Sequence, residues 1–182
     1  LQMARAEFEE AKETMVMLSD IIEEVGARMY SSSYVKLNLK YGRLDFLRNA
    51  SHIELLLSTD NENLTLIDTY TSCLRYRSTV NFPVVEENLT GAVDSIIIGE
   101  SESLVSVYIE QDSEGPTIHL ASRSIRLVNE GVTYLQSRNK YVNLYGITLV
   151  RISIGQTFGS GSLNIKAHGR TISVDARIVD SS

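Results

Sequence analysis

The side chains that most often perform catalysis or bind metals do not form a recognisable pattern in this sequence. The three histidines, His52, His119 and His168, lie far apart, and no two of them have the His-x-x-x-His spacing of a helical metal site. Cys73 is the single cysteine, which excludes an intramolecular disulfide and a thiolate zinc cluster. It falls in an apolar-rich stretch, where we expect a buried, inert thiol. We interpret the histidines as surface or hydrogen-bonded strand residues.

The acidic and glycine-rich segments also lack the features of known sites. No Asp-x-Asp-x-Asp-Gly calcium loop is present. Residues 155–162, Gly-Gln-Thr-Phe-Gly-Ser-Gly-Ser, lack the Gly-Lys-Ser/Thr ending of a phosphate-binding loop, and no helical pattern follows them. We expect a loop between two strands there. The sequence thus predicts no catalytic residue, no metal and no cofactor, and favours a protein that is not an enzyme.

Three Asn-x-Ser/Thr sequons offer possible sites of covalent modification. Their asparagines are Asn49, Asn63 and Asn88, at expected strand ends or in a loop. Chance predicts about two such sequons in a chain of this composition, so they are a weak signal of N-glycosylation.

The N-terminal thirty residues carry the clearest structural pattern. Apolar residues recur at alternating steps of four and three, which predicts one narrow apolar stripe on a single helix face. The stripe consists of Ala4, Phe8, Ala11, Met15, Leu18, Ile22, Val25 and Met29. Seven acidic side chains cover much of the rest of the helix, and we expect them to stay in solvent. We interpret the segment as the soluble end of a longer helix whose apolar upstream part is missing.

After a break at Ser31–Ser33 the periodicity changes from about 3.6 to 2, which indicates β-strands. A hairpin is expected between 34–40 and 43–46, with the turn at Tyr41-Gly42. Further strands are predicted at 52–58, 63–69, 72–80, 92–98, 104–110, 117–128, 132–137, 140–144, 147–154, 163–167 and 172–178. Turns are expected at 59–62, 129–131 and 137–139, and a longer connection at 82–91.

These patterns predict an α+β fold in which a long amphipathic helix, residues 1–30, packs on a β-rich globular head, residues 31–182. The head is expected to be an antiparallel β-sandwich or a strongly curled sheet. The stripe has two possible uses: it packs on the chain's own sheet, or it pairs with other helices in a coiled coil. Alanine at two stripe positions and phenylalanine at a third favour packing on the sheet.

The charge distribution restricts the class of partner. The chain has 17 basic and 23 acidic residues, a formal net charge of −6. The first thirty residues carry three basic and seven acidic side chains, so most of the negative charge lies in the helix. No basic patch or arm is present, which argues against nucleic acid as a partner. No run of about eighteen apolar residues occurs that would cross a membrane.

A long amphipathic helix followed by a β-rich head resembles the type IV pilin architecture. The sequence more closely resembles archaeal pilin-like surface proteins, through the strand Tyr34-Val35-Lys36-Leu37-Asn38-Leu39, the step Gly42-Arg43-Leu44, and the segments Gly131-Val132-Thr133-Tyr134-Leu135 and 144–152. The accessory subunits of archaeal swimming filaments, with a β-sandwich ectodomain, are a specific variant. The resemblance implies a pilin-like fold and an upstream anchor helix.

The resemblance to pilin-like proteins further implies an extracellular, membrane- or filament-anchored protein. Its expected partners are copies of itself, other pilin-like subunits or a surface layer, with the membrane reached through the upstream helix. The expected function is filament assembly, surface anchoring or adhesion. The alternative is a carbohydrate- or small-ligand-binding β module, in which Tyr70, Tyr76, Tyr134, Tyr141 and Tyr145 supply stacking platforms.

Overall fold

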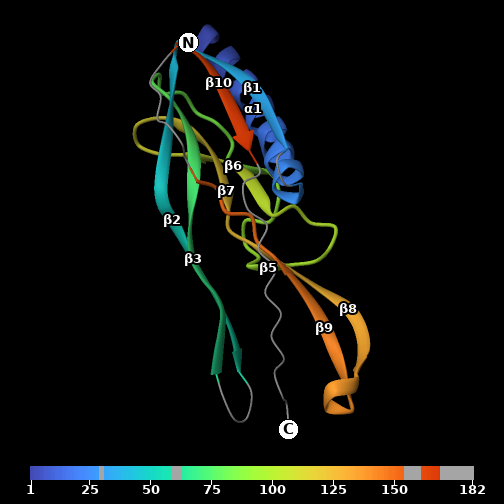
Figure 1. The fold of residues 1–182 in the computed structure, drawn as a ribbon. Helices are drawn as coiled ribbons and strands as arrows, with labels where there is room; N and C mark the ends of the chain where they lie inside the picture. Colours follow the sequence, from blue (N-terminus) through green and yellow to red (C-terminus); the bar gives the residue numbers. More distant parts are fainter. Residues whose placement is uncertain (29–30, 59–62, 154–160, 169–182) are drawn as a thin grey trace.

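The computed structural model describes residues 1–28, 31–58, 63–153 and 161–168. The fold is α+β, with one N-terminal helix, α1 (Gln2–Ala27), and strands that are mostly antiparallel (Figure 1). The strands are β1 (Ser32–Leu39), β2 (Gly42–Ser58), β3 (Asn63–Ser78), β4 (Glu87–Thr90), β5 (Ile97–Ile98), β6 (Val105–Gln111), β7 (Pro116–Ser122), β8 (Ile125–Leu135), β9 (Lys140–Thr148) and β10 (Gly161–His168). A 3₁₀ turn, η1 (Gln136–Arg138), joins β8 to β9.

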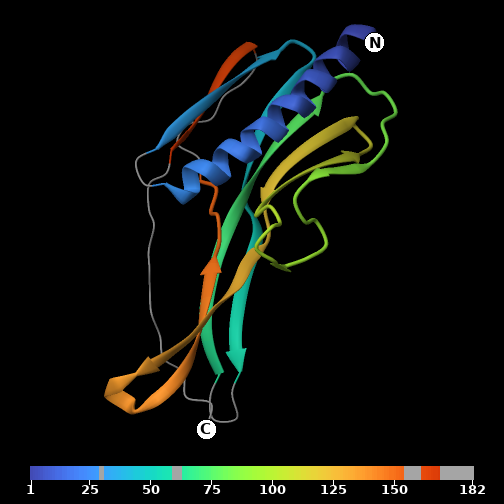
Figure 2. The same cartoon turned by 90° about the vertical axis from the view of Figure 1, so that its right-hand side faces the viewer.

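The strands in the described residues form three sheets. The largest has the order β2-β3-β7-β6-β4, a second pairs β1 with β10, and a third has the order β5-β8-β9. All pairs are antiparallel except the short pair β5–β8. The β8–β9 hairpin, the end of β2 and the start of β3 project toward the end of the molecule opposite Leu1 (Figures 1 and 2).

The helix packs against the β1–β10 pair and against the five-stranded sheet. Its stripe residues Ala4, Phe8, Ala11, Met15, Leu18 and Val25 are buried, and Ile22 is half-buried; Met29 lies outside the described residues. Phe8 contacts Tyr76 and Phe82 edge to face, with ring centroids 5.9 and 5.6 Å apart. The remaining core comes from β1, β10 and the inner faces of β2, β3, β6 and β7. The helix and the strands therefore share one hydrophobic core.

A buried carboxylate on α1 joins three parts of the chain. Glu7 Oε2 accepts hydrogen bonds from the backbone nitrogens of Lys40 and Tyr41, both at 2.9 Å. Its Oε1 accepts one from the hydroxyl of Tyr76, at 3.2 Å. Burial, together with the Glu7 charge, raises the pKa of Tyr76, which keeps that hydroxyl protonated as a donor.

Not all of the helical acids are solvated, contrary to the expectation from sequence. Glu7 is buried, and Glu23 is half-buried and accepts bonds from Ser103 Oγ (2.7 Å) and Val105 N (2.9 Å). Glu7 lies three residues after Ala4 and four before Ala11, so helical geometry places it on the buried side. A carboxylate can occupy such a position because hydrogen-bond donors offset the cost of burying its charge.

The predicted hairpin between 34–40 and 43–46 is wrong. β1 pairs with β10 and β2 pairs with β3, and neither Tyr41 nor Gly42 has the positive φ of a two-residue hairpin turn. The amides at the corner bond to Glu7 instead of closing a turn. Gly42 is needed for a different reason: a Cβ there would lie 2.3 Å from the ring of Tyr76.

Several predicted strand boundaries are also wrong. The segments 43–46 and 52–58 form one strand, because a bulge with Asn49 at φ 53° keeps the pairing with β3. The segments 63–69 and 72–80 likewise form one strand, and β4 lies in the expected connection 82–91. Of the predicted strand 92–98 only β5 is present. Within the predicted strand 147–154, residues 147–148 end β9 and residues 149–153 are not in a strand.

The predicted strand 117–128 divides at Arg123–Ser124. Beyond this point the chain leaves β6 and pairs with β5, where Ile125 N donates to Ile96 O at 2.7 Å. The predicted turn at 129–131 is instead a bulge inside β8, while the turn at 137–139 is present as η1. The turn at 59–62, most of the loop 155–162 and the strand 172–178 lie outside the described residues.

We predict that Glu7→Ala lowers the free energy of unfolding by about 3 kcal/mol, since it leaves three donors without their acceptor. The matched control is Glu13→Ala, which removes an exposed helical glutamate and is expected to change stability by less than about 0.5 kcal/mol. Urea unfolding monitored by circular dichroism measures both. Equal losses in the two variants would contradict the role assigned to Glu7.

Candidate functional site

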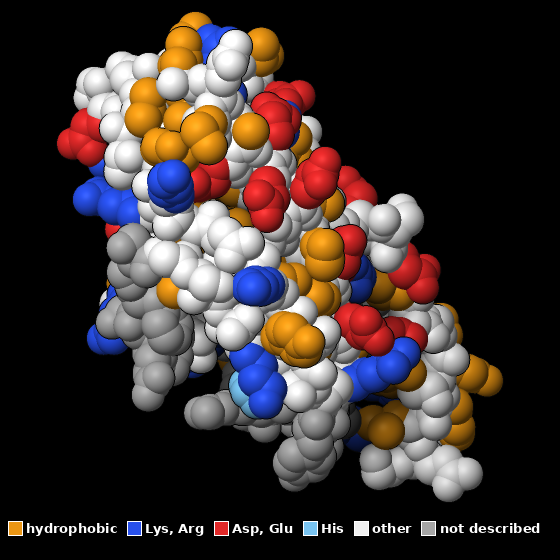
Figure 3. All heavy atoms as spheres, turned by 90° about the horizontal axis from the view of Figure 1, so that it is seen from above, with side chains coloured by type: hydrophobic (Ala, Val, Ile, Leu, Met, Phe, Trp, Pro, Cys, Tyr) orange, Lys and Arg blue, Asp and Glu red, His pale blue; other side chains and the backbone are white. Residues whose placement is uncertain are grey.

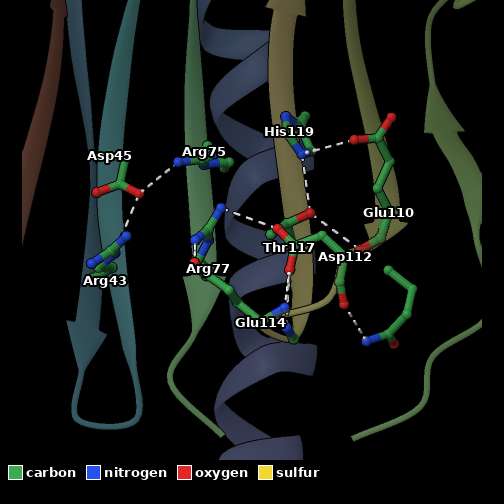
Figure 4. Close-up of polar contacts among 11 residues, drawn as sticks. Arg43, Asp45, Arg75, Arg77, Glu110, Asp112, Glu114, Thr117 and His119 are labelled. Atoms are coloured by element: carbon green, nitrogen blue, oxygen red, sulfur yellow. Dashed lines mark hydrogen bonds and ion pairs between the residues drawn. The ribbon is translucent and has the colours of Figure 1, made fainter. Parts of the chain in front are cut away.

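A group of charged and titratable side chains lies on the face of the five-stranded sheet that points away from α1 (Figure 4). We call it the outer-face cluster. Successive side chains along a strand point to opposite faces of the sheet. Because Leu74, Tyr76, Ile118 and Leu120 face inward, the residues next to them in the sequence face outward, and the strand register places these side by side. The cluster consists of Arg43, Asp45, Arg75, Arg77, Glu110, Asp112, Glu114, Thr117 and His119.

The charged residues of the outer-face cluster are paired with one another. Asp45 lies 3.1 Å from Arg75 and 3.3 Å from Arg43. Arg77 lies 3.0 Å from Asp112 and also contacts Glu114. The three arginines and four acids nearly cancel, so the cluster does not form a strongly charged surface. It ties β2, β3, β7 and the β6–β7 loop together.

His119 is the buried titratable group at the centre of the cluster. Its Nε2 lies 3.2 Å from Glu110 and 3.0 Å from Thr117 Oγ1, and its ring stacks on Tyr108 at 5.0 Å. The hydroxyl of Thr117 donates to the Glu110 carbonyl, so we assign the Nε2 proton to the bond with the Glu110 carboxylate. Burial, followed by the charge of Arg75, lowers the pKa of His119 to about 4. The imidazole is therefore neutral at pH 7.

Cys73 lies beside His119, with 3.7 Å between Sγ and Nδ1. The pairing invites comparison with a cysteine–histidine catalytic dyad. Burial raises the pKa of the Cys73 thiol to about 11, while the pKa of His119 is lowered. Proton transfer from the thiol to the imidazole is strongly unfavourable with these pKa values, and the thiol is 3% exposed. The pair fits the buried, inert thiol expected from sequence better than a nucleophile.

The other two histidines lie apart from this cluster. His52 Nε2 is 2.7 Å from Asp68, and the ring stacks on Tyr70 on the projecting part of β2–β3. His168 ends β10. In the described ranges no group of three or more His, Cys, Asp or Glu side chains could hold a metal ion.

The three sequon asparagines are all exposed. Asn49 lies at the bulge of β2, and Asn63 is the first residue of β3. Asn88, in β4, donates through Nδ2 to the carbonyl of Gly91 at 2.6 Å. Modification of Asn88 would therefore replace one of the two protons on the nitrogen that makes this bond.

The tyrosines proposed as stacking platforms separate into three groups. Tyr76 is buried, and Tyr70 stacks on His52. Tyr134, Tyr141 and Tyr145 lie together on one face of the β8–β9 hairpin, and the rings of Tyr134 and Tyr141 are 5.1 Å apart. The same face carries three further exposed apolar side chains. We call it the tyrosine face, formed by Leu127, Val132, Tyr134, Tyr141, Tyr145 and Ile147.

Sequence reasoning did not find the tyrosine face as a unit or the inward-facing helical acids. The bulge at Asn129/Gly131 shifts the alternation of β8, so Leu127 and Val132 share a face although their spacing is odd. For β9, the spacing of residues 141, 143, 145 and 147 at every second position was the signal that these side chains share one face. For Glu7, the signal was its position between Ala4 and Ala11.

The comparisons with known proteins identify no relative. No protein-family model, no curated protein and no solved structure matches the chain. No helix in the described part of the chain has both the length and the apolar composition needed to cross a membrane.

We predict that His119 makes stability depend on pH. Its pKa is about 4 in the folded chain and about 6.5 when unfolded, so the unfolded chain binds more protons between these values. The stabilisation is complete above pH 6.5 and is lost as the pH falls toward 4. We expect wild type to lose about 2 kcal/mol more than His119→Gln between pH 7.5 and 5. Urea unfolding at both pH values measures this.

The matched control is Asn38→Gln, which changes an exposed side chain on β1 that does not titrate and should leave the wild-type pH dependence unchanged. An NMR titration of wild type supplies a direct check. A measured pKa of 6 or above for His119 would contradict the prediction.

Proposed function

We propose that this chain is the ectodomain of a pilin-like cell-surface protein of the archaeal type, acting in filament assembly, surface anchoring or adhesion. The observation that carries the proposal is the position of α1. The helix lies along an antiparallel sheet and contributes its apolar stripe to the core of the head. The resemblance of the helix–strand boundary and the later strand segments to archaeal pilin-like proteins supports the same assignment.

The polar contacts of the helix suit a load-transmitting connection. Glu7 holds the first half of α1 to the β1–β2 corner and to β3, and Glu23 holds the second half to the start of β6. A force applied along the helix is thus distributed over several strands. An anchor helix that transmits tension to a surface head requires this kind of attachment.

The proposal predicts an apolar run of about twenty residues encoded immediately upstream of Leu1, long enough to span a bilayer. The gene sequence tests this first. In cell fractions, the native protein should remain with membranes or filaments after a high-salt wash, because an apolar anchor is insensitive to ionic strength. A start codon directly before Leu1, or full release by salt, would contradict the proposal.

A second candidate function is binding of a carbohydrate or small ligand. The observation that favours it is the tyrosine face, where exposed Tyr134, Tyr141 and Tyr145 stand close to Asn129 and Asn143. Aromatic rings stack on the apolar faces of sugars, and amide side chains hydrogen-bond to hydroxyl groups. The two residue types together are typical of a shallow carbohydrate site.

For this function we predict that a glycan array yields at least one ligand, and that this ligand raises the melting temperature of wild type at millimolar concentration. Tyr141→Ala should abolish the shift, since it removes a ring that is 77% exposed and available for stacking. Tyr34→Ala, on β1, is the control and should retain it. No hit on the array at millimolar ligand would count against the function.

A further inference from the structure

Two surfaces outside the outer-face cluster have complementary character. The first is a groove of about 430 Å³ on the outer side of α1, lined by Lys12, Glu13, Val16, Met17, Asp20 and Leu89. The second is the tyrosine face, with the basic residues at the tip of the same hairpin. We propose that the hairpin of one copy docks in the groove of a second copy.

The groove has an apolar floor and an acidic rim. Met17 is 54% exposed, and Val16 and Leu89 are half-buried beside it. The charge of Lys12 is offset by Glu9 at 3.1 Å and Glu87 at 3.2 Å. Glu13 and Asp20 have no ion-pair partner in the part of the chain that the structure describes. The groove therefore suits an apolar side chain flanked by positive charge.

Acidic side chains interspersed with hydrophobic ones gather along one side of the molecule when it is viewed from the end that carries Leu1 (Figure 3). Residues 1–28 carry three basic and seven acidic side chains; among these acids, Glu7 is buried and Glu23 is half-buried. An occupant of this side gains electrostatic attraction from a net positive charge. The complementary occupant must therefore combine apolar and basic groups.

The β8–β9 hairpin has this combination. Residues 125–148 contain Arg126, Arg138 and Lys140 against a single acid, Glu130. Arg138 in η1 and Lys140 at the start of β9 lie at the tip of the hairpin, next to the pair formed by Tyr134 and Tyr141. The register places Lys140 on the face opposite the two rings. Tyr141 is the most exposed tyrosine of the face. A buried tyrosine contributes roughly 150–250 Å² to a contact, which makes Tyr141 a suitable anchor.

The contact must form between two copies. The hairpin projects toward the end of the molecule opposite Leu1, whereas α1 runs along the other half (Figures 1 and 2). Because the two patches differ, the contact is heterologous: each copy offers one groove and one hairpin. Such a contact repeats from copy to copy, and it produces an open chain when the rotation between copies does not close a ring. The inference rests on the proposed function and deepens it, since it supplies a subunit contact for a filament.

The test is the oligomeric state of the 182-residue chain, measured by analytical ultracentrifugation over a concentration series. A single hairpin tip buries less than a standard interface of roughly 1,600 Å², so we expect association between about 10 µM and 1 mM. Raising NaCl from about 0.05 M to about 0.5 M should weaken it at least fivefold, since the charges at the rim are screened.

Two variants disrupt the groove and the tyrosine face separately. Met17→Lys places a positive charge in the groove, and Tyr141→Glu places a negative charge on the tyrosine face; each should abolish self-association. The controls are Leu56→Lys and Tyr34→Glu, which replace side chains exposed by 54% and 68% on β2 and β1, and both should associate as wild type does. Circular dichroism confirms that all four are folded.

A mixture of Met17→Lys and Tyr141→Glu tests whether the contact is heterologous. Met17→Lys retains an intact hairpin and Tyr141→Glu retains an intact groove, so the mixture should form a 1:1 complex that does not grow further. A mixture that stays monomeric while wild type associates would overturn the proposal.

Wild type that remains monomeric at about 1 mM would also overturn it, and would leave the tyrosine face to a carbohydrate or another partner. Membrane anchoring is measured independently by the upstream sequence and fractionation, so failure of this contact is distinguishable from failure of the proposed function.

Discussion

The arrangement of the whole chain depends on the buried carboxylate of Glu7. A charge at this depth is tolerated only because three donors converge on it: two backbone amides of the corner between β1 and β2, and the hydroxyl of Tyr76. The corner amides are thus occupied, and β1 does not fold back on β2. It crosses to the other side of α1 and pairs with β10. The same convergence draws Tyr76 against position 42, where a glycine is then required.

The five-stranded sheet separates packing from polar chemistry by its two faces. Its inner face packs against the helix through apolar contacts, and its outer face carries arginines and acids that pair with each other across β2, β3 and the β6–β7 loop. The buried His119 and Cys73 are held neutral within this network, because the low-polarity surroundings disfavour both charged forms. Groups that are paired or neutralised in this way stabilise the sheet. The outer side of α1 and the β8–β9 hairpin lie outside this network, and both carry exposed apolar side chains.

Patterns over short stretches of the sequence predicted the structure that depends on residues close together in the chain. The helix follows from the spacing of Ala4, Phe8, Ala11 and Met15, and the α+β class follows from the change of period after it. Strand pairing could not be predicted, since β1 and β10 are more than a hundred residues apart and their pairing depends on the helix between the sheets. Asn49 and the residues near Gly131 were interpreted as ends of strands, although bulges let the strands continue there. The outer-face cluster follows from register across four strands, which spacing along the chain does not reveal.

The acidity of α1 has two physically different roles once the structure is known. Glu7 and Glu23 point inward and accept hydrogen bonds from the head. The contribution of these bonds to stability depends on the burial of each carboxylate and on the geometry of its donors. Glu13 and Asp20 line the groove on the outer side of α1, where their charges are screened by salt and favour a basic occupant in the contact proposed above. The sequence presents all of them as one polar surface. In the proposed subunit contact, α1 needs both kinds of acid. A helix with only solvated acids would attract a partner without fixing the head, and a helix with only buried acids would leave no charge to guide assembly.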